Sequence, residues 1–175
     1  MRLAVIILIL SWQCLGSVPV TNAADADILW GKAVELAKQG QMDLAFINFR
    51  MLVDVYPDFP KTPTAQLDLG EYYFLQNNYP LAAQEFQNFS TKYPKRQESL
   101  IALSYLYKIA QINGQKQSMQ EHQKRIVASH QAVFIFKDSK SLEYVSGFQR
   151  KYKLVFYIDK LEVFANGKLF VTVPY

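Results

Sequence analysis

Two stretches of this chain repeat one another, and this internal repeat is the feature that most restricts its fold. When Met42–Pro57 is aligned with Tyr79–Pro94, Leu, Ala, Phe, Tyr and Pro recur at one constant offset. In each stretch the apolar residues fall at positions i, i+4, i+7 and i+11, which form a single stripe along an α-helix. The closing Pro of each stretch cannot continue the helical hydrogen-bond ladder, so the helix ends there. A repeat of this kind predicts an array of helical units.

Each repeated helix is preceded by another predicted helix, so the expected units are helical hairpins. The leading helices cover residues 28–38 and 64–76, and each stops at a Gly or Asn, residues that tolerate the left-handed conformation at a helix C-terminus. A third, degraded hairpin is expected from residues 97–112 and 115–130. The second helix of that pair has a face rich in Gln and Lys, which is typical of a cap that meets water instead of another repeat.

The residue pattern of the hairpins resembles that of the tetratricopeptide repeat (TPR), whose units carry Leu-Gly, Tyr, Ala, Phe and Pro in order. Lys32 departs from this pattern at the position that Leu69 occupies in the second unit. The style of the repeat is similar to that of the outer-membrane-assembly TPR lipoproteins and the periplasmic TPR proteins of the Tol–Pal system. The resemblance implies a partner-binding α-solenoid of two to three TPR hairpins. The matching residues are Leu69, Gly70, Tyr73, Ala82, Phe86 and Pro94 in the second unit, and Ala33, Leu36, Ala45, Phe49 and Pro57 in the first.

The period of the pattern changes after the third hairpin. Ala132–Phe136 and Tyr152–Ile158 are short runs rich in β-branched and aromatic residues, as are Leu161–Ala165 and Lys168–Val173. Asn166-Gly167 separates the last two runs, and this dipeptide is a strong hairpin signal because a type I′ turn needs positive φ at both central residues. The runs predict a small antiparallel sheet of three to five strands. The expected fold class is therefore α+β, with an N-terminal helical solenoid followed by this sheet.

The N-terminus has the features of a secretory signal peptide. Met1-Arg2 supplies a positive charge, Leu3–Leu10 is an unbroken apolar run, and small residues follow at Ala23-Ala24, where cleavage is expected. The apolar run is too short to cross a bilayer as a helix, which needs about 20 residues. The alternative is a retained N-terminal anchor. We expect an exported protein that is periplasmic or associated with the outer membrane.

Cys14 raises the alternative of a lipoprotein, but its surroundings do not fit that processing signal. The lipoprotein signal that this region would have to resemble has Leu three residues before the Cys and Gly or Ala directly before it. Here those positions are Ser11 and Gln13. We therefore expect Cys14 to leave with the leader. The expected organisation is a signal peptide at 1–24, TPR-like helical repeats at 25–130 (units 26–62, 63–96 and 97–130) and a small β-region at 131–175.

The net charge of +4 hides a difference between the two halves of the chain. Acidic residues exceed basic ones from Asp25 to Tyr93, whereas Lys and Arg dominate the remainder. Arg150, Lys151 and Lys153 form a basic stretch that could contact an anionic membrane surface or an acidic protein face. The alternative is a solvated loop and strand edge, where Lys discourages aggregation. No nucleic-acid partner is expected for an exported chain.

Recognisable catalytic chemistry is absent from the sequence. There is no Gly-x-Ser-x-Gly motif and no phosphate-binding glycine loop. His122 and His130 lie about two helical turns apart without a third metal ligand at suitable spacing. Glu71 and Glu85 are interpreted as residues of solvated helix faces. We therefore expect that the protein is not an enzyme and binds no cofactor and no metal.

Partner binding is expected on the concave face of the helical array. In TPRs, positions on the first helix of each pair line that face, and Trp30 and Phe74 are the candidate anchors because aromatic side chains supply large desolvated contact area. The alternative is that these side chains pack against neighbouring helices or the β-region. The predicted groove consists of Trp30, Val34, Leu67, Glu71 and Phe74.

Three functions are compatible with these patterns. The first is a non-catalytic adaptor or assembly factor of the cell envelope that mediates protein–protein interactions with other envelope proteins or peptides. The second is a structural subunit of an envelope machine, such as a secretion, pilus or outer-membrane complex, whose C-terminal strands pair with a partner. The third, least favoured, is an enzyme of unrecognised type.

Overall fold

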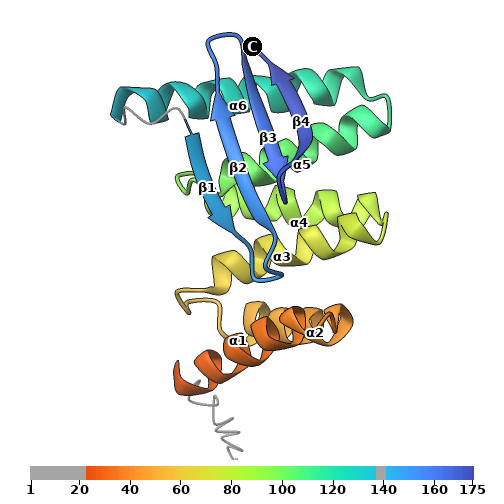
Figure 1. The fold of residues 1–175 in the computed structure, drawn as a ribbon, viewed down its shortest axis with the longest axis vertical. Helices are drawn as coiled ribbons and strands as arrows, with labels where there is room; N and C mark the ends of the chain where they lie inside the picture. The colour runs from red at the N-terminus through yellow and green to blue at the C-terminus, as the bar shows by residue number, and fades with distance from the viewer. Residues whose placement is uncertain (1–22, 137–140) are drawn as a thin grey trace, which may run out of the picture.

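The computed structural model describes residues 23–136 and 141–175 of the chain. In these ranges six helices precede four strands, so the fold is α+β with a C-terminal sheet (Figure 1). The predicted leader lies outside the described residues, except that Ala23 and Ala24 begin the first helix. The elements are α1 (Ala23–Lys38), α2 (Met42–Val55), α3 (Thr62–Leu75), α4 (Tyr79–Lys92), α5 (Ser99–Ile112), α6 (Lys116–Phe136), β1 (Ser141–Val145), β2 (Lys151–Phe156), β3 (Lys160–Ala165) and β4 (Lys168–Pro174).

The six helices pack consecutively, each against the next, which is compatible with a helical repeat (Figure 1). The expectation of two to three hairpins therefore understated the helical part, which has six helices among the described residues. The predicted turns are present: Gly40, Asn77 and Gly114 all have positive φ after helices α1, α3 and α5. Pro80 occupies the first turn of α4, where its missing N–H would be unpaired in any case.

The repeat residues produce a close contact between α3 and α4. A Cβ added at Gly70 would lie 2.7 Å from the ring of Phe86, which is fully buried. Ala82 is buried on the same helix as Phe86. Small residues at Gly70 and Ala82 therefore let the two helices approach, and the Phe86 ring fills the space between them.

Helix α6 corrects one prediction about the β-region. Ala132–Phe136, expected as a strand, is the last part of α6. A short apolar run cannot be assigned to helix or strand by its period alone, and here the preceding helix continues through it. The first strand is instead Ser141–Val145, whose mixed composition did not predict it.

The four strands form one antiparallel sheet in the order β1-β2-β3-β4. Asn166 and Gly167 have φ of 50° and 76°, so the predicted hairpin between β3 and β4 is present with positive φ at both central residues. A β-bulge between Val163 and Phe164 interrupts the β3–β4 register. The β1–β2 register is unbroken.

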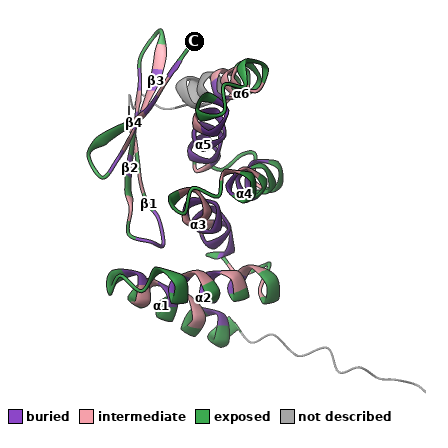
Figure 2. Cartoon of the chain, turned by 90° about the vertical axis from the view of Figure 1, so that its right-hand side faces the viewer, coloured by how far each residue is buried: buried purple, intermediate pink, exposed green. Residues whose placement is uncertain are grey.

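The sheet covers the face of the helical stack formed by α3 and α5 (Figure 2). Alternate residues of the strands are buried against the helices, and the intervening residues face outward. This arrangement joins α3, α4, α5, α6 and the sheet in one apolar core. A second core lies between α1, α2 and α3, and Phe148 from the β1–β2 loop belongs to it. The buried strand residues are Tyr152, Leu154, Phe156, Leu161, Val163, Ala165, Val171 and Val173.

Candidate functional site

The loop between β1 and β2 inserts into the helical stack between α2 and α3. The Phe148 ring packs edge-on against Phe49 at 5.2 Å and stacks on Tyr72 at 6.2 Å between ring centroids. Gly147 is also buried, and a Cβ there would overlap the carboxylate of Asp68 and lie 2.6 Å from the Phe49 ring. The loop therefore needs Gly at this position because of the close approach to helix α3.

The carboxylate of Asp68 on α3 forms hydrogen bonds with this loop. Both oxygens of its carboxylate accept from the backbone N–H of Gly147, at 3.0 and 3.1 Å. Its side chain is fully buried, and burial raises the pKa of the carboxyl well above its usual range. The nearby Glu71 raises the pKa further, while the Gly147 N–H lowers it.

Glu71 lies one helical turn further along α3 and is also buried, with 1% of its surface exposed. Its carboxylate oxygen is 3.7 Å from Nε of Arg150, and neither oxygen has a hydrogen-bond partner of ordinary geometry among the described residues. Burial raises the pKa of Glu71 to about 7, against the opposing effects of Arg150 and of the Ser146 and Tyr152 hydroxyls. This interpretation corrects the expectation that Glu71 belongs to a solvated face.

Glu85 is likewise buried instead of solvated. Its two carboxylate oxygens accept from Arg50 and from Gln66, each at 2.5 Å, and Arg50 forms an ion pair with it. The ion pair joins α2 to α4, and the hydrogen bond joins α3 to α4. Glu85 therefore connects neighbouring helices, and these contacts account for a buried carboxylate at this position.

The predicted groove positions on the second unit contact the chain's own sheet. Leu67 is buried in the core shared with the sheet, and Phe74 packs against Tyr105 at 4.8 Å and Phe170 at 5.6 Å between ring centroids. Together with the buried Glu71, these residues do not line an open groove. Phe74 was expected either to line a groove or to pack against the chain itself. In the structure it packs against the β-region.

The first unit leaves its groove residues partly exposed. The Trp30 ring packs against Phe49 at 5.4 Å between centroids, and Nζ of Lys61 lies 6.0 Å from the Trp30 ring centroid. Val34 packs against the same core as Trp30. Trp30 and Val34 keep some accessible surface, and binding of a partner there stays a prediction.

The predicted basic contact is divided between the two faces of the sheet. Arg150 is partly buried, faces Glu71 and lies with its Cζ 5.9 Å from the centroid of the Tyr152 ring. Lys151 and Lys153 are exposed on the outer face of β2. Their exposure agrees with the alternative of a solvated stretch, but the strand-edge part of that alternative is wrong because β2 is an inner strand.

Several residues around Asp68 and Glu71 were not singled out from the sequence. Asp68 stands between two buried leucines on α3, and this was its available signal. Tyr105 and Tyr152 share a buried hydroxyl–hydroxyl hydrogen bond of 2.6 Å that joins α5 to β2. This pair could not be found from the sequence because the two residues are far apart in the chain and come together only in the fold.

Two carboxyls with raised pKa values are a pattern that active sites often use. Here Asp68 and Glu71 are covered by the β1–β2 loop and have almost no surface for a substrate. In the described ranges, no group of three or more His, Cys, Asp or Glu side chains is placed to hold a metal ion. No helix among the described residues is both long and apolar enough to cross a membrane. The arrangement holds the sheet on the helices.

Comparison with protein-family models finds none that matches this chain, and comparison with curated proteins finds no match.

Proposed function

We propose that this chain is a non-catalytic adaptor or assembly factor of the bacterial cell envelope, built on TPR-type hairpins and acting through protein–protein contacts. Export rests on the N-terminal signal pattern, and the repeat type rests on the residues shared by the two hairpin units. The two buried carboxyls support a non-catalytic role because they hold the sheet on the helices and are closed to substrates.

One surface observation carries the proposal. Leu44, Ile47, Met51 and Val55 form an apolar row on the outer side of α2, here called the α2 stripe, and each is 42% to 53% exposed. Their spacing places them on one helix face, opposite the buried Phe49. Contiguous exposed apolar surface of this kind marks interaction sites in soluble proteins. The α2 stripe is thus the favoured contact for a partner protein, in place of a groove that the sheet fills.

Photo-crosslinking in cells tests this contact. A photoreactive amino acid at Ile47 is expected to give protein adducts, whereas the same amino acid at the exposed polar residue Gln84 on α4 gives few. Equal adducts from both positions, or none from Ile47, would remove the support for the α2 stripe. The mass of the protein recovered from the envelope tests export, since cleavage after Ala23 or Ala24 leaves Ala24 or Asp25 as the first residue.

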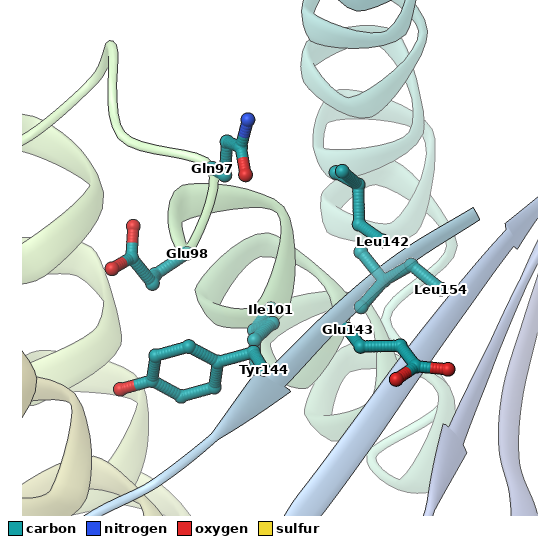
Figure 3. A pocket seen from close by; sticks show the side chains of 7 residues that line it. All are labelled: Gln97, Glu98, Ile101, Leu142, Glu143, Tyr144 and Leu154. Atoms are coloured by element: carbon teal, nitrogen blue, oxygen red, sulfur yellow. The ribbon is translucent and has the colours of Figure 1, made fainter. Parts of the chain in front are cut away.

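The alternative function is a structural subunit of an envelope machine whose C-terminal strands pair with a partner. The observation that favours it is that β1 is an edge strand of the sheet and lies next to a pocket (Figure 3). Crosslinks from β1 to one abundant envelope complex would favour this reading, whereas adducts to several unrelated proteins would favour the adaptor.

A further inference from the structure

The two edges of the sheet differ in their protection against pairing with another strand. At the β4 edge, Pro174 has no backbone N–H, and its carbonyl oxygen accepts from Nε2 of Gln123 on α6 at 2.7 Å. The bulge at Val163/Phe164 distorts the β3–β4 ladder, and Lys168 begins the strand. Pro, Lys, bulges and covering helices are the means by which proteins block an edge. The β4 edge is blocked by all of them.

Among the described residues, none of these features protects strand β1. Its residues, Ser141–Val145, include no Pro and no Lys, and its register with β2 is unbroken. The Ser146 N–H donates to the Arg150 carbonyl at 3.0 Å, which fixes the alternation of the antiparallel ladder. By that alternation, the backbone groups of Glu143 and Val145 point away from β2, into the space beside the strand. The β1 edge can therefore form a further ladder at Glu143 and Val145.

A pocket lies where an added strand would place its inward side chains (Figure 3). Its volume is about 160 Å³, between β1 and the start of α5. Ile101 and Leu154 give it a buried apolar surface, and Leu142 points into the same region. An added strand would continue the sheet over α5, and its inward residues would find apolar contacts there. The other lining residues are Gln97, Glu98, Glu143 and Tyr144.

Charge decides which occupant suits this edge. Glu143 is exposed at the centre of β1, and no ion pair among the described residues joins it to Lys153, its neighbour on β2. Glu98 is already paired with Arg96 at 3.0 Å. If two copies of the chain paired β1 with β1 about this centre, the two Glu143 side chains would lie opposite each other, which is destabilising. A second copy is therefore disfavoured, and a basic partner residue is favoured.

We propose that β1 accepts an extended segment of a partner protein as a fifth strand, with a Lys or Arg facing Glu143 and apolar residues on both sides of it facing the pocket. This inference rests on the proposed function as a protein-binding module. It names the partner chemistry as a strand-forming sequence of the pattern apolar–basic–apolar, because neighbouring residues of a strand point to opposite faces.

The test uses the mature full chain and a library of random nine-residue peptides displayed on phage. We expect enrichment of sequences in which Lys or Arg stands between β-branched or aromatic residues. Synthetic copies should bind at least tenfold more weakly to Glu143→Lys, and a Lys→Glu peptide should recover binding to that variant. Glu121→Lys, the same charge change at an exposed position on α6, should bind like the wild type.

Two further measurements test the backbone pairing. Val145→Pro removes an N–H that points away from β2, so it should abolish peptide binding while circular dichroism shows a folded protein. N-methylation of one set of alternate peptide residues should abolish binding to the unchanged protein, whereas N-methylation of the other set should be tolerated, because only alternate N–H groups of an added strand face β1. This comparison keeps the test valid if Val145→Pro does not fold. Enriched peptides that bind Val145→Pro as well as wild type, and that tolerate N-methylation of either set, would overturn the strand addition but leave a protein-binding module. Absence of any enriched peptide would overturn the strand addition, whereas the protein-binding function would fail separately, by the absence of adducts from Ile47.

Discussion

The backbone N–H of Gly147 is held between the two carboxylate oxygens of Asp68, although the two residues are 79 positions apart in the chain. This contact fastens the β1–β2 loop to α3 and so places the sheet over the helices. The same loop buries Phe148 beside Phe49, which joins the sheet to the first helical pair. The position of the sheet, and with it the surface open to partners, depends on this small polar cluster.

Gly147→Ala is expected to destabilise the protein by about 1–3 kcal/mol, because the added Cβ overlaps Asp68 and the Phe49 ring in a closed site. Urea unfolding followed by circular dichroism measures the change. The matched control is Gly31→Ala on α1, where a Cβ would meet nothing within 4 Å. That change should stabilise by about 0.5–1 kcal/mol through helix propensity. Equal effects of the two substitutions would contradict the close approach at Gly147.

The stability of the protein is expected to fall as pH rises from about 4.5 to about 7. The pKa of Glu71 is raised from 4.5 to about 7 by burial, so over this window the folded state binds more protons than the unfolded state. The folded form is then favoured at the acidic end, and the loss across the window is on the order of 3 kcal/mol. Asp68, whose pKa is also raised, acts in the same direction.

Glu71→Gln tests the origin of that pH dependence. The variant should have a flatter profile of unfolding free energy between pH 5 and pH 8, because one of the two titrating carboxyls is gone. Glu35→Gln, at an exposed position on α1, should keep the wild-type profile. A Glu71→Gln protein with an unchanged slope would show that Glu71 titrates normally in the folded state.

Arg150→Gln is expected to destabilise the protein more at pH 8 than at pH 5. Arg150 lowers the pKa of Glu71, so its removal should move the pKa above 7 and leave a buried charge without its partner at high pH. A loss of about 3 kcal/mol at pH 8 is expected. The neighbouring Lys151→Gln removes the same charge from an exposed site and should change stability by less than about 0.5 kcal/mol. Equal losses at both pH values would argue against the Glu71 contact.

The hydrogen bond between the Tyr105 and Tyr152 hydroxyls should give a measurable coupling. Either Tyr→Phe change leaves a buried hydroxyl without this partner, at a cost of about 1–3 kcal/mol. The double variant should lose less than the sum of the single losses, and a double-mutant cycle measures the difference. Tyr152→Phe should cost more than Tyr105→Phe, because the Tyr152 hydroxyl also faces Glu71. Strict additivity would show that the two hydroxyls do not interact.

The helical part could be predicted from the sequence because its signals are local. The stripe that contains Phe49, the stripe that contains Phe86 and the turn at Asn77 all depend on residues within one unit of the chain. The β3–β4 hairpin was predictable for the same reason, since Asn166-Gly167 determines its turn. Ala132–Phe136 was assigned wrongly because a short apolar run suits either a helix or a strand.

Local residue patterns were enough to predict the helical pairs, their turns and the presence of a C-terminal sheet. They did not show that this sheet covers α3 and α5, that Glu71 is buried against Arg150, or that β1 is an edge strand. The difference comes from the range of the interactions. Helices and tight turns follow from hydrogen bonds and side-chain spacing between near neighbours, whereas the place of the sheet follows from contacts such as Asp68 with Gly147, which no local pattern encodes.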